Sequence, residues 1–470
     1  MSAEPLVLYD TRTRRKRPFQ PLEPELVRMY TCGPTVYAPQ HLGNLRSQLF
    51  ADLLKRALLF EGYRVRHVIN ITDVGHLTGD LDAGEDKLER AAAQSGRRAS
   101  EIAAEYTAQW LRDRERLGCL APDVLCKATQ HIPEQIELVR LLEAKGYTYR
   151  IADGIYFDTS KFPRYAEFAR LDLNAQAAGA RIGDVSGKRQ AADFALWKFA
   201  PPGAHRQQEW DSPWGRGFPG WHLECSAMAE KYLGLRFDIH TGGVDHVAVH
   251  HTNELAQSEC AHDVHPWVGY WLHNEFLDLR GEKMAKSTGN VAVLDDLVAR
   301  GLPPLAFRYF FLQAHYRQQQ TYTDEAVEAA ATGYDRLLGV CAELREAAGE
   351  ADPARTLPLR ERFRAAVRDD LNAPRALAVA WEVARDAGLG AAERWAVLRE
   401  ADAVLGLDLA RGVPRAEVVQ SDPRIDALVA ERVAARERRD FATADRIRRQ
   451  LAEEGVVIED TPQGSRWRRA

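Results

Sequence analysis

A strand–helix–strand pattern near the start of the chain constrains the fold most strongly. Residues 26–32 have the composition of a strand, and in residues 45–62 the apolar side chains recur at helical spacing. Residues 65–71 are typical of a second strand. Because two strands joined by one helix run parallel, the pattern predicts a βαβ unit in a parallel sheet. Ligands of such sheets bind at the carboxyl ends of strands, where Cys32 and His41 fall.

The rest of the chain suggests further regions around this unit. Residues 86–146 are predicted to be helical, residues 147–213 are broken by Pro and Gly, and a strand at 236–240 resumes the sheet. After residue 323 the sequence is almost wholly amphipathic helix, and two short strands, 456–459 and 465–468, close the tail. A chain of 470 residues is too long for one core, so several domains are expected.

Composition excludes some classes of protein. The chain is 45% hydrophobic and 28% charged, as in ordinary globular proteins. It has no apolar run of the roughly 18 residues that span a bilayer, and its first residues do not resemble a signal peptide. We therefore expect a cytoplasmic protein without a membrane partner. The net charge of −5 does not indicate a nucleic-acid binder, so any RNA would have to be met by local basic patches.

Six cysteines are too few for a disulfide scaffold, and no spacing is CxxC. Four of them are expected to be structural thiols: Cys119, Cys126, Cys260 and Cys341.

The segment His41-Leu42-Gly43-Asn44 falls where a strand gives way to a helix. A helix N-terminus offers unpaired N–H groups and partial positive charge, which suit a phosphate. Gly43 lets the backbone approach a ligand closely. His41 and Asn44 could then donate hydrogen bonds to the ligand. Taken alone, the segment could equally be a polar turn capped by Asn44.

A second polar segment, 283–287, reads Lys-Met-Ala-Lys-Ser between glycines. Two mobile ammonium groups, Lys283 and Lys286, can stabilise a pentacoordinate phosphate, and the glycines allow the loop to open and close. A solvated lysine loop is the alternative for this segment alone.

His250 and Glu254 lie four residues apart, so on a helix they share one face and can bind one metal ion. Cys32 and Cys225 are too far apart in the chain for a finger-type module, and a site built from distant strand ends is more often functional than structural. A core thiol at Cys225 and a surface histidine at position 250 are the plain alternatives.

Together, the segments at 41–44 and 283–287 resemble the HIGH and KMSKS motifs of class I aminoacyl-tRNA synthetases, with departures at Asn44 and Ala285. The set of Cys32, Cys225, His250 and Glu254 resembles the zinc site of the cysteinyl-tRNA synthetase family. The resemblance runs over essentially the whole chain.

The resemblance implies an activity, cofactors and partners. It implies a cysteine–tRNA ligase that forms cysteinyl-adenylate from L-cysteine and ATP with Mg²⁺ and then acylates tRNA(Cys). One Zn²⁺ per chain would bind the substrate thiolate beside the four ligands. Serine cannot reproduce that bond, whereas selection by size alone gains only about 1–3 kcal/mol. The enzyme is expected to be a monomer.

The resemblance also assigns residues around the site. His41, Asn44, Lys283 and Lys286 would be catalytic, and Lys286 would contact ATP directly. The remaining expected contacts are Gly43, Gly243 and Asp245 for ATP, and Thr72 and Trp221 for the amino acid.

The implied fold is α/β. It has a doubly wound, Rossmann-like parallel-sheet catalytic domain with a small insertion, then an all-α helical bundle and a small basic C-terminal domain. The expected boundaries are 1–125 and 211–275 for the two catalytic halves, 126–210 for the connective insertion, 276–322 for the region of the KMSKS loop that contacts the RNA stem, 323–415 for the bundle, and 423–470 for the basic domain.

The tail carries a further signal for an RNA partner. Residues 423–470 hold eleven arginines against nine acidic residues, and residues 431–449 are predicted to form one arginine-striped helix. Arginines with an aromatic residue such as Trp467 suit a single-stranded RNA loop, although a salt-laced solvated helix remains open.

Two rivals remain at this point. One is a cysteine ligase that acts on an amino-sugar, and the other is a non-catalytic RNA-binding paralogue. The basic tail argues against the first, and retention of the motif residues argues against the second.

Overall fold

The computed structural model describes residues 4–74, 77, 84–171, 186–200, 206–279, 282–283, 291–347, 349–411, 423–438, 440–454, 456–461 and 464–469. The chain forms two compact units, Met1–Leu409 and Ala410–Ala470. Among the described helices, none combines the length and apolar character needed to cross a bilayer.

A five-stranded parallel sheet forms the centre of the first unit, in the order β11-β10-β3-β4-β5. Its strands are β3 (Leu26–Thr31), β4 (Arg64–Ile71), β5 (Val124–Lys127), β10 (Phe237–Gly243) and β11 (Val268–Asn274). The predicted βαβ unit is therefore confirmed. The prediction of helix throughout 86–146 was wrong at β5, whose four residues pair with β4 but are too few to show a period in the sequence.

Helix α1 (Leu42–Phe60) joins β3 to β4 and begins three residues earlier than its apolar spacing predicted. Its apolar side chains, including Leu45, Leu49 and Leu53, are buried, and so are several of its polar ones. The helix is enclosed because one hydrophobic cluster joins one face of the sheet to α1 and to the helices that follow. A second cluster covers the other face, so the sheet is buried on both sides, as parallel sheets are.

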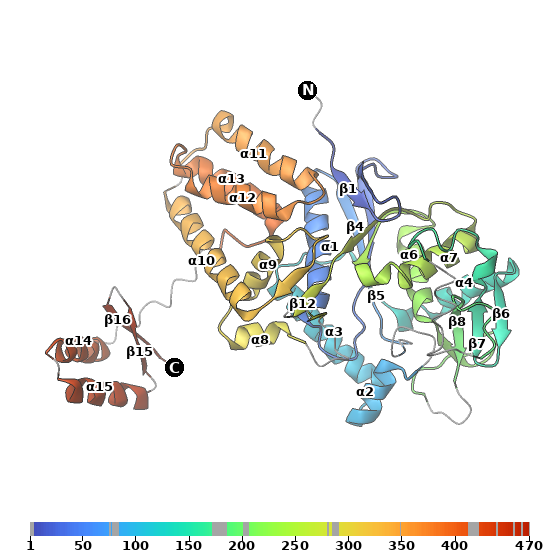
Figure 1. The fold of residues 1–470 in the computed structure, drawn as a ribbon, viewed down its shortest axis with the longest axis horizontal. Coiled ribbons are helices and arrows are strands. Elements are labelled where there is room, and N and C mark those ends of the chain that lie inside the picture. Colours follow the sequence, from blue (N-terminus) through green and yellow to red (C-terminus); the bar gives the residue numbers. More distant parts are fainter. Residues whose placement is uncertain are drawn as a thin grey trace. The chain divides into compact units, whose positions relative to one another are not determined.

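The second cluster contains helices α4 (Ile132–Ala144), α6 (Trp221–Leu233) and α7 (His250–His262). Beside them lies an antiparallel sheet in the order β6-β7-β8-β9. Its strands are β6 (Thr148–Ile151), β7 (Gly154–Phe157), β8 (Phe194–Phe199) and β9 (Gly217–Pro219). Figure 1 shows this sheet on the side of the unit away from the later helices.

The smaller elements complete the first unit. At the edge strand β11 lies the hairpin of β1 (Val7–Asp10) and β2 (Arg15–Pro18), and β5 is preceded by α2 (Lys87–Ser95) and α3 (Ala99–Arg116). A three-stranded sheet in the order β13-β12-β14 follows β11, made of β12 (Leu277–Leu279), β13 (Glu282–Lys283) and β14 (Gln320–Tyr322).

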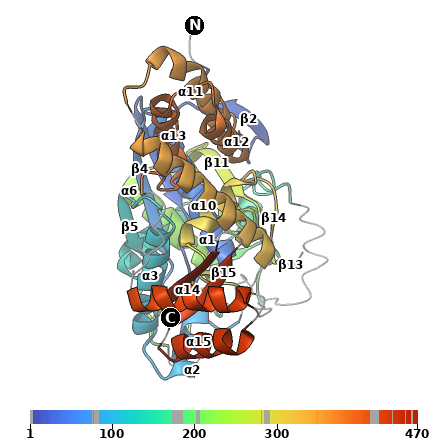
Figure 2. The same cartoon turned by 90° about the vertical axis from the view of Figure 1, so that its left-hand side faces the viewer.

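Six described helices of the first unit follow β13 and, like α1, contribute side chains to the first cluster; the last four of them lie together beside α1 in Figure 2. They are α8 (Leu294–Ala299), α9 (Pro304–Leu312), α10 (Asp324–Glu346), α11 (Pro353–Arg368), α12 (Ala373–Arg385) and α13 (Ala391–Leu405). A buried ion pair ties them to α1, because the Arg308 guanidinium on α9 donates to the Asp52 carboxylate at 2.5 Å.

The second unit contains α14 (Pro423–Glu437), α15 (Phe441–Glu453) and an antiparallel pair, β15 (Val456–Thr461) and β16 (Gly464–Arg469). Both predicted tail strands are confirmed. The prediction of one helix over 431–449 was wrong, because Asp440 starts a new helix by accepting a hydrogen bond from the backbone N–H of Thr443 at 3.1 Å.

Candidate active site and metal centre

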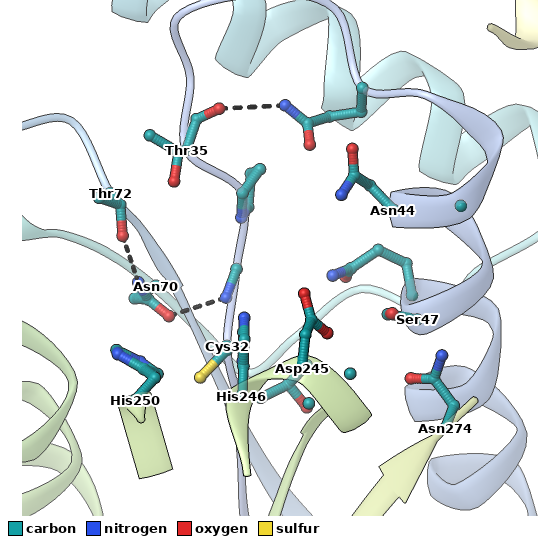
Figure 3. A pocket seen from close by; sticks show the side chains of 18 of the residues that line it. Cys32, Thr35, Asn44, Ser47, Asn70, Thr72, Asp245, His246, His250 and Asn274 are labelled. Atoms are coloured by element: carbon teal, nitrogen blue, oxygen red, sulfur yellow. Dashed lines mark hydrogen bonds between the residues drawn. The ribbon is translucent and has the colours of Figure 1, made fainter. Parts of the chain in front are cut away.

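A cavity of about 460 Å³ lies at the carboxyl ends of β3, β4 and β10 and at the N-terminus of α1 (Figure 3). The structure brings most of the predicted site residues to its wall. These are Cys32, His41, Gly43, Asn44, Thr72, Trp221, Cys225, Gly243, Asp245 and His250. Glu254 lies one turn further along α7, behind His250. Lys283 is at the end of β13, and Lys286 lies outside the described residues.

The start of α1 is fixed by His41. Its Nδ1 accepts a hydrogen bond from the backbone N–H of Asn44 at 3.1 Å, so His41 is the N-cap. A cap at Asn44 is therefore wrong, since Asn44 lies within the first turn. The first turn itself faces the cavity through Gly43, Asn44 and Ser47. A helix N-terminus in this place is suited to an anionic ligand.

Thr72 is oriented by its neighbours at the end of β4. The Asn70 side chain accepts a hydrogen bond from the Gly33 backbone N–H at 2.8 Å and donates one to the Thr72 hydroxyl at 3.1 Å (Figure 3). Thr72 is 3% exposed, so its hydroxyl is held in a fixed position at the cavity wall.

The end of β10 approaches the cavity through glycines. A Cβ atom on Gly242 would lie 2.7 Å from the His251 ring and 2.8 Å from the His246 ring. Any larger residue would push both rings aside. Gly242 therefore leaves room for the His246 and His251 rings, and Gly243 does the same for the Asp245 carboxylate.

Four buried side chains, which we call the donor cluster, meet at one point beside the cavity: Cys32, Cys225, His250 and Glu254. One ligand atom from each lies within 4.8 Å of the others. His250 Nε2 is 2.8 Å from Glu254 Oε1, because the two residues are one turn apart on α7. The same carboxylate oxygen is 3.9 Å from Cys32 Sγ.

Charge interactions within the donor cluster displace its pKa values. Burial alone would raise the pKa of Cys225, but the hydrogen bond from Cys32 and the adjacent His250 lower it to about 6. Burial and the Cys225 thiolate raise the pKa of Cys32 well above its usual value. Burial also opposes the charged forms of His250 and Glu254. Their mutual attraction nevertheless raises the histidine pKa to about 10, and together with His240 it lowers the carboxyl pKa to about 2.

Further histidines surround the donor cluster, and the sequence analysis did not identify them. His240 Nε2 lies 2.9 Å from Glu254 Oε2, and the Nδ1 atoms of His222 and His250 are 3.0 Å apart. On the other side, His251 Nδ1 lies 2.7 Å from His273 Nε2. Eight of the 14 histidines fall between residues 222 and 273, and that density was an available signal.

The donor cluster fits a metal ion. Two other combinations of side chains, which include the half-buried His246 or the buried His251 and His240, also come close enough to share an ion. The donor cluster alone unites both thiols with the imidazole and carboxylate of α7. His240 and His222 stand beside its ligands, as supporting groups do around protein metal sites. Thiolates with imidazole are the donors that soft and borderline cations such as Zn²⁺ prefer.

Comparison with known proteins identifies the family of this chain. Residues 18–332 match the family of class I (C) tRNA synthetase catalytic domains, and residues 420–468 match the cysteinyl-tRNA ligase anticodon-binding domain. A cysteine–tRNA ligase of Burkholderia lata is 50% identical, with 98% of this chain and 96% of that protein covered. The cysteine–tRNA ligase of Thermus thermophilus is 42% identical, with 98% and 99% covered.

Two solved structures share the fold at low sequence identity. The LeuRS of Agrobacterium radiobacter, in a ternary complex with tRNA, has a TM-score of 0.60 at 12% identity and covers 86% of each chain. The methionyl-tRNA synthetase of Mycobacterium tuberculosis bound by methionyl-adenylate has a TM-score of 0.54 at 18% identity, covering 82% of this chain and 91% of that one. The predicted Rossmann-like catalytic domain followed by helices is thereby confirmed. The full-length matches, together with the cavity and its donor cluster, show that this chain belongs to the cysteine–tRNA ligase family of class I synthetases.

Proposed function

We infer that this chain activates L-cysteine with ATP to cysteinyl-adenylate and transfers the cysteine to the 3′-terminal ribose of tRNA(Cys). The observation that carries this function is the position of the donor cluster. It opens on the same cavity as the N-terminus of α1, so a group suited to a thiol and a group suited to phosphate face one enclosed space. The full-length family match supports the same reaction.

In this proposal Zn²⁺ is held by Cys32, Cys225, His250 and Glu254. When bound, it supplies a site at which a thiolate is a far better ligand than a serine hydroxyl. Glu254 is kept ionised by His240 and His250, so the chain holds this carboxylate ready to bind a cation. Selection through a sulfur ligand needs no separate editing domain.

The remaining cavity residues position the substrates. His41, Gly43 and Asn44 receive the triphosphate of ATP, which is used with Mg²⁺. Gly243 and Asp245 receive the ribose, and Thr72 and Trp221 line the amino-acid side. Lys283 and Lys286 stabilise charge on the phosphates during transfer. No side chain acts as a nucleophile, because the substrate carboxylate attacks first and the ribose hydroxyl of the tRNA attacks second. The chain contributes orientation and electrostatic stabilisation.

The C-terminal unit is proposed to hold the anticodon side of the tRNA. Its helices present exposed arginines at 436, 446, 448 and 449, Arg438 is exposed just after α14, and Phe441 is 61% exposed at the start of α15. Guanidinium groups suit RNA phosphates, and an exposed ring suits an unstacked base. The match of residues 420–468 to an anticodon-binding domain favours tRNA as the acceptor, and nothing supports an amino-sugar acceptor.

We further propose the domain division given by the resemblance. The catalytic halves are 1–125 and 211–275, the insertion is 126–210, the stem-contact region is 276–322, the bundle is 323–415 and the basic domain is 423–470. The enzyme would act as a monomer in the cytoplasm.

Cysteine-dependent exchange of pyrophosphate into ATP tests the proposal, with serine as the control substrate and acylation of a tRNA(Cys) transcript measured alongside. We expect exchange with cysteine but not serine, together with acylated tRNA. Exchange without acylation would point to a different acceptor. Absence of exchange in zinc-loaded protein would overturn the proposed activity.

A further inference from the structure

Among the described residues that line the cavity, Lys87 is the only lysine or arginine. The same wall carries two carboxylates, Asp245 and Glu275. Under the proposed function the cavity must receive a nucleoside triphosphate, whose charge is about −4 at neutral pH, and later the 3′ end of an RNA. A cavity that takes such anions needs positive charge near the phosphates, because those interactions strengthen where water is excluded.

The chain fixes the position of Lys87 firmly. Lys87 is the first residue of α2, and Asp86 caps that helix by accepting hydrogen bonds from the backbone N–H groups of Leu88 at 2.8 Å and Glu89 at 3.2 Å. The second oxygen of the buried Asp86 carboxylate accepts a hydrogen bond from the Arg206 guanidinium at 2.7 Å. The start of α2 is therefore anchored to the segment that precedes β9.

A second contact reinforces this anchor. The Glu89 carboxylate accepts hydrogen bonds from the backbone N–H groups of Gln207 and Gln208, at 2.9 and 3.0 Å. On the other side, the Gln208 side chain donates to the Asp73 carbonyl at 2.8 Å, just after β4. The helix that carries Lys87 is thus tied to the end of the central sheet.

The side chain of Lys87 extends to the loop that leads into α1. Its ammonium lies 5.9 Å from the centre of the Tyr37 ring, and Tyr37 also lines the cavity. A lysine ammonium is a compact charge with three donors on a flexible stem, so it can follow a phosphate through a reaction. Lys87 is half-buried, which limits the screening of its charge by water.

We propose that Lys87 is a phosphate-binding residue of the active site, which pairs through its ammonium with a phosphate group of a substrate held in the cavity. The inference rests on the proposed function for the identity of the substrates. The phosphate can come from the triphosphate of ATP or from the 3′-terminal nucleotide of the tRNA. These two sources act at different steps, so kinetics separates them.

The experiment compares Lys87→Met with Lys87→Arg in the full-length, zinc-loaded protein. ATP–pyrophosphate exchange at varied ATP reports the first source. Transfer of cysteine from preformed adenylate at varied tRNA(Cys) transcript, in a single turnover, reports the second. We expect Lys87→Met to raise half-saturation by about tenfold in one of the two assays, as loss of a charge-assisted hydrogen bond would. Lys87→Arg should restore it to within about threefold.

Arg90→Ala provides a matched control, because Arg90 is exposed on the same helix and does not line the cavity. It removes the same charge from α2 and should leave both half-saturation values unchanged. If Lys87→Met leaves both values unchanged, or if Arg90→Ala changes them equally, the assignment is wrong. A defect that Lys87→Arg does not rescue, together with a lower melting temperature, would also overturn it in favour of a purely structural role.

Calorimetric titration with a non-hydrolysable ATP analogue separates this inference from the proposed function. If wild-type protein shows no exchange, the proposed function fails. Weaker binding of the analogue to Lys87→Met than to wild type would then still support the ATP source, and equal binding would exclude it.

Discussion

Two clusters of ionisable side chains in the first unit are similarly buried but differ in how far their charges are compensated. The junction pair, Asp52 on α1 and Arg308 on α9, is almost fully buried, as is the donor cluster. Asp52 also accepts from Arg56 at 2.7 Å and from the Leu120 N–H at 2.6 Å, and Arg308 donates to two backbone carbonyls. Burial would raise the pKa of Asp52, but the Arg308 and Arg56 guanidinium groups hold it below its usual value.

The donor cluster is balanced only in part. His240 and His250 satisfy Glu254, but the pKa values of the two thiols move in opposite directions: that of Cys225 is lowered and that of Cys32 is raised. Ionisation of Cys32 as well would place two thiolates and a carboxylate around one point, which requires a cation from outside the chain. The comparison teaches that buried ionisable groups indicate a binding site only where the chain does not itself supply the compensating charge.

The largest expected effect comes from removing a thiol. Cys225→Ser should abolish stoichiometric zinc and lower cysteine-dependent exchange by at least about 1000-fold, or about 4 kcal/mol, because a serine hydroxyl does not ionise in this environment. Zinc content by atomic absorption and exchange rates check this. Cys126→Ser, a buried thiol outside the donor cluster, should retain the metal. If the Cys225→Ser protein still binds one zinc per chain, the contrast between the donor cluster and the junction pair is wrong.

Breaking the junction pair of Asp52 and Arg308 should lower the stability of the protein and leave zinc binding unchanged. Arg308→Met leaves the buried Asp52 carboxylate with one fewer cation, so the free energy of unfolding in urea should fall by about 3 kcal/mol. Zinc content should stay at one per chain. Arg362→Met, which removes an exposed pair with Glu382 on neighbouring helices, should cost less than about 1 kcal/mol. Equal losses in the two variants would show that burial of the junction is irrelevant.

Removing a residue that hydrogen-bonds to a ligand of the donor cluster should lower the zinc affinity without abolishing zinc binding. His240→Asn takes away the partner of Glu254 Oε2, and zinc affinity should fall by about 10–100-fold. Competition with a chelator measures this affinity. His67→Asn is the control, because His67 is equally buried in the same sheet, on β4, but bonds to the Thr31 hydroxyl. If both variants lose affinity equally, His240 has no special role.

Asp113 on α3 is a buried carboxyl whose negative charge is only partly compensated, which places it between the junction pair and the donor cluster. Burial raises its pKa to about 6, which the nearby Arg116 only partly offsets while Asp295 adds to it. A raised pKa means that protonation favours the fold. This contribution is complete below the unfolded value of 3.8 and is lost as pH rises through about 6. Asp113→Asn should therefore stabilise the protein by about 1 kcal/mol at pH 8, with little effect at pH 4. Urea titrations at both pH values test this, and a loss of stability at pH 8 would contradict it.

Local patterns were sufficient to predict much of the fold. Helix α1 follows from the helical spacing of its apolar residues, and strands β3, β4 and β10 follow from their β-branched and aromatic residues. Strand β5 escaped prediction because four residues carry no period. The break before α15 depends on one capping contact of Asp440, which the arginine pattern around it concealed.

Residues of the candidate site that belong to sequence motifs could be predicted. Residues that join the site only through long-range contacts could not. Cys32, His250 and Glu254 stand in recognisable segments. His240 does not, since its role depends on the approach of β10 to α7, which no local pattern encodes. The same holds for Lys87, which reaches the cavity only because Asp86 and Glu89 anchor α2 to a distant segment.

The donor cluster can be completed only late in the synthesis of the chain. Cys32 and Glu254 are separated by 222 positions. A ribosome that adds about 5–20 residues per second needs roughly 10–45 s to travel from the first to the second. For that whole interval the set of Cys32, Cys225, His250 and Glu254 is incomplete. Under the proposed metal site, binding of the ion by all four side chains would therefore be a late step, which follows synthesis of the proposed insertion at 126–210.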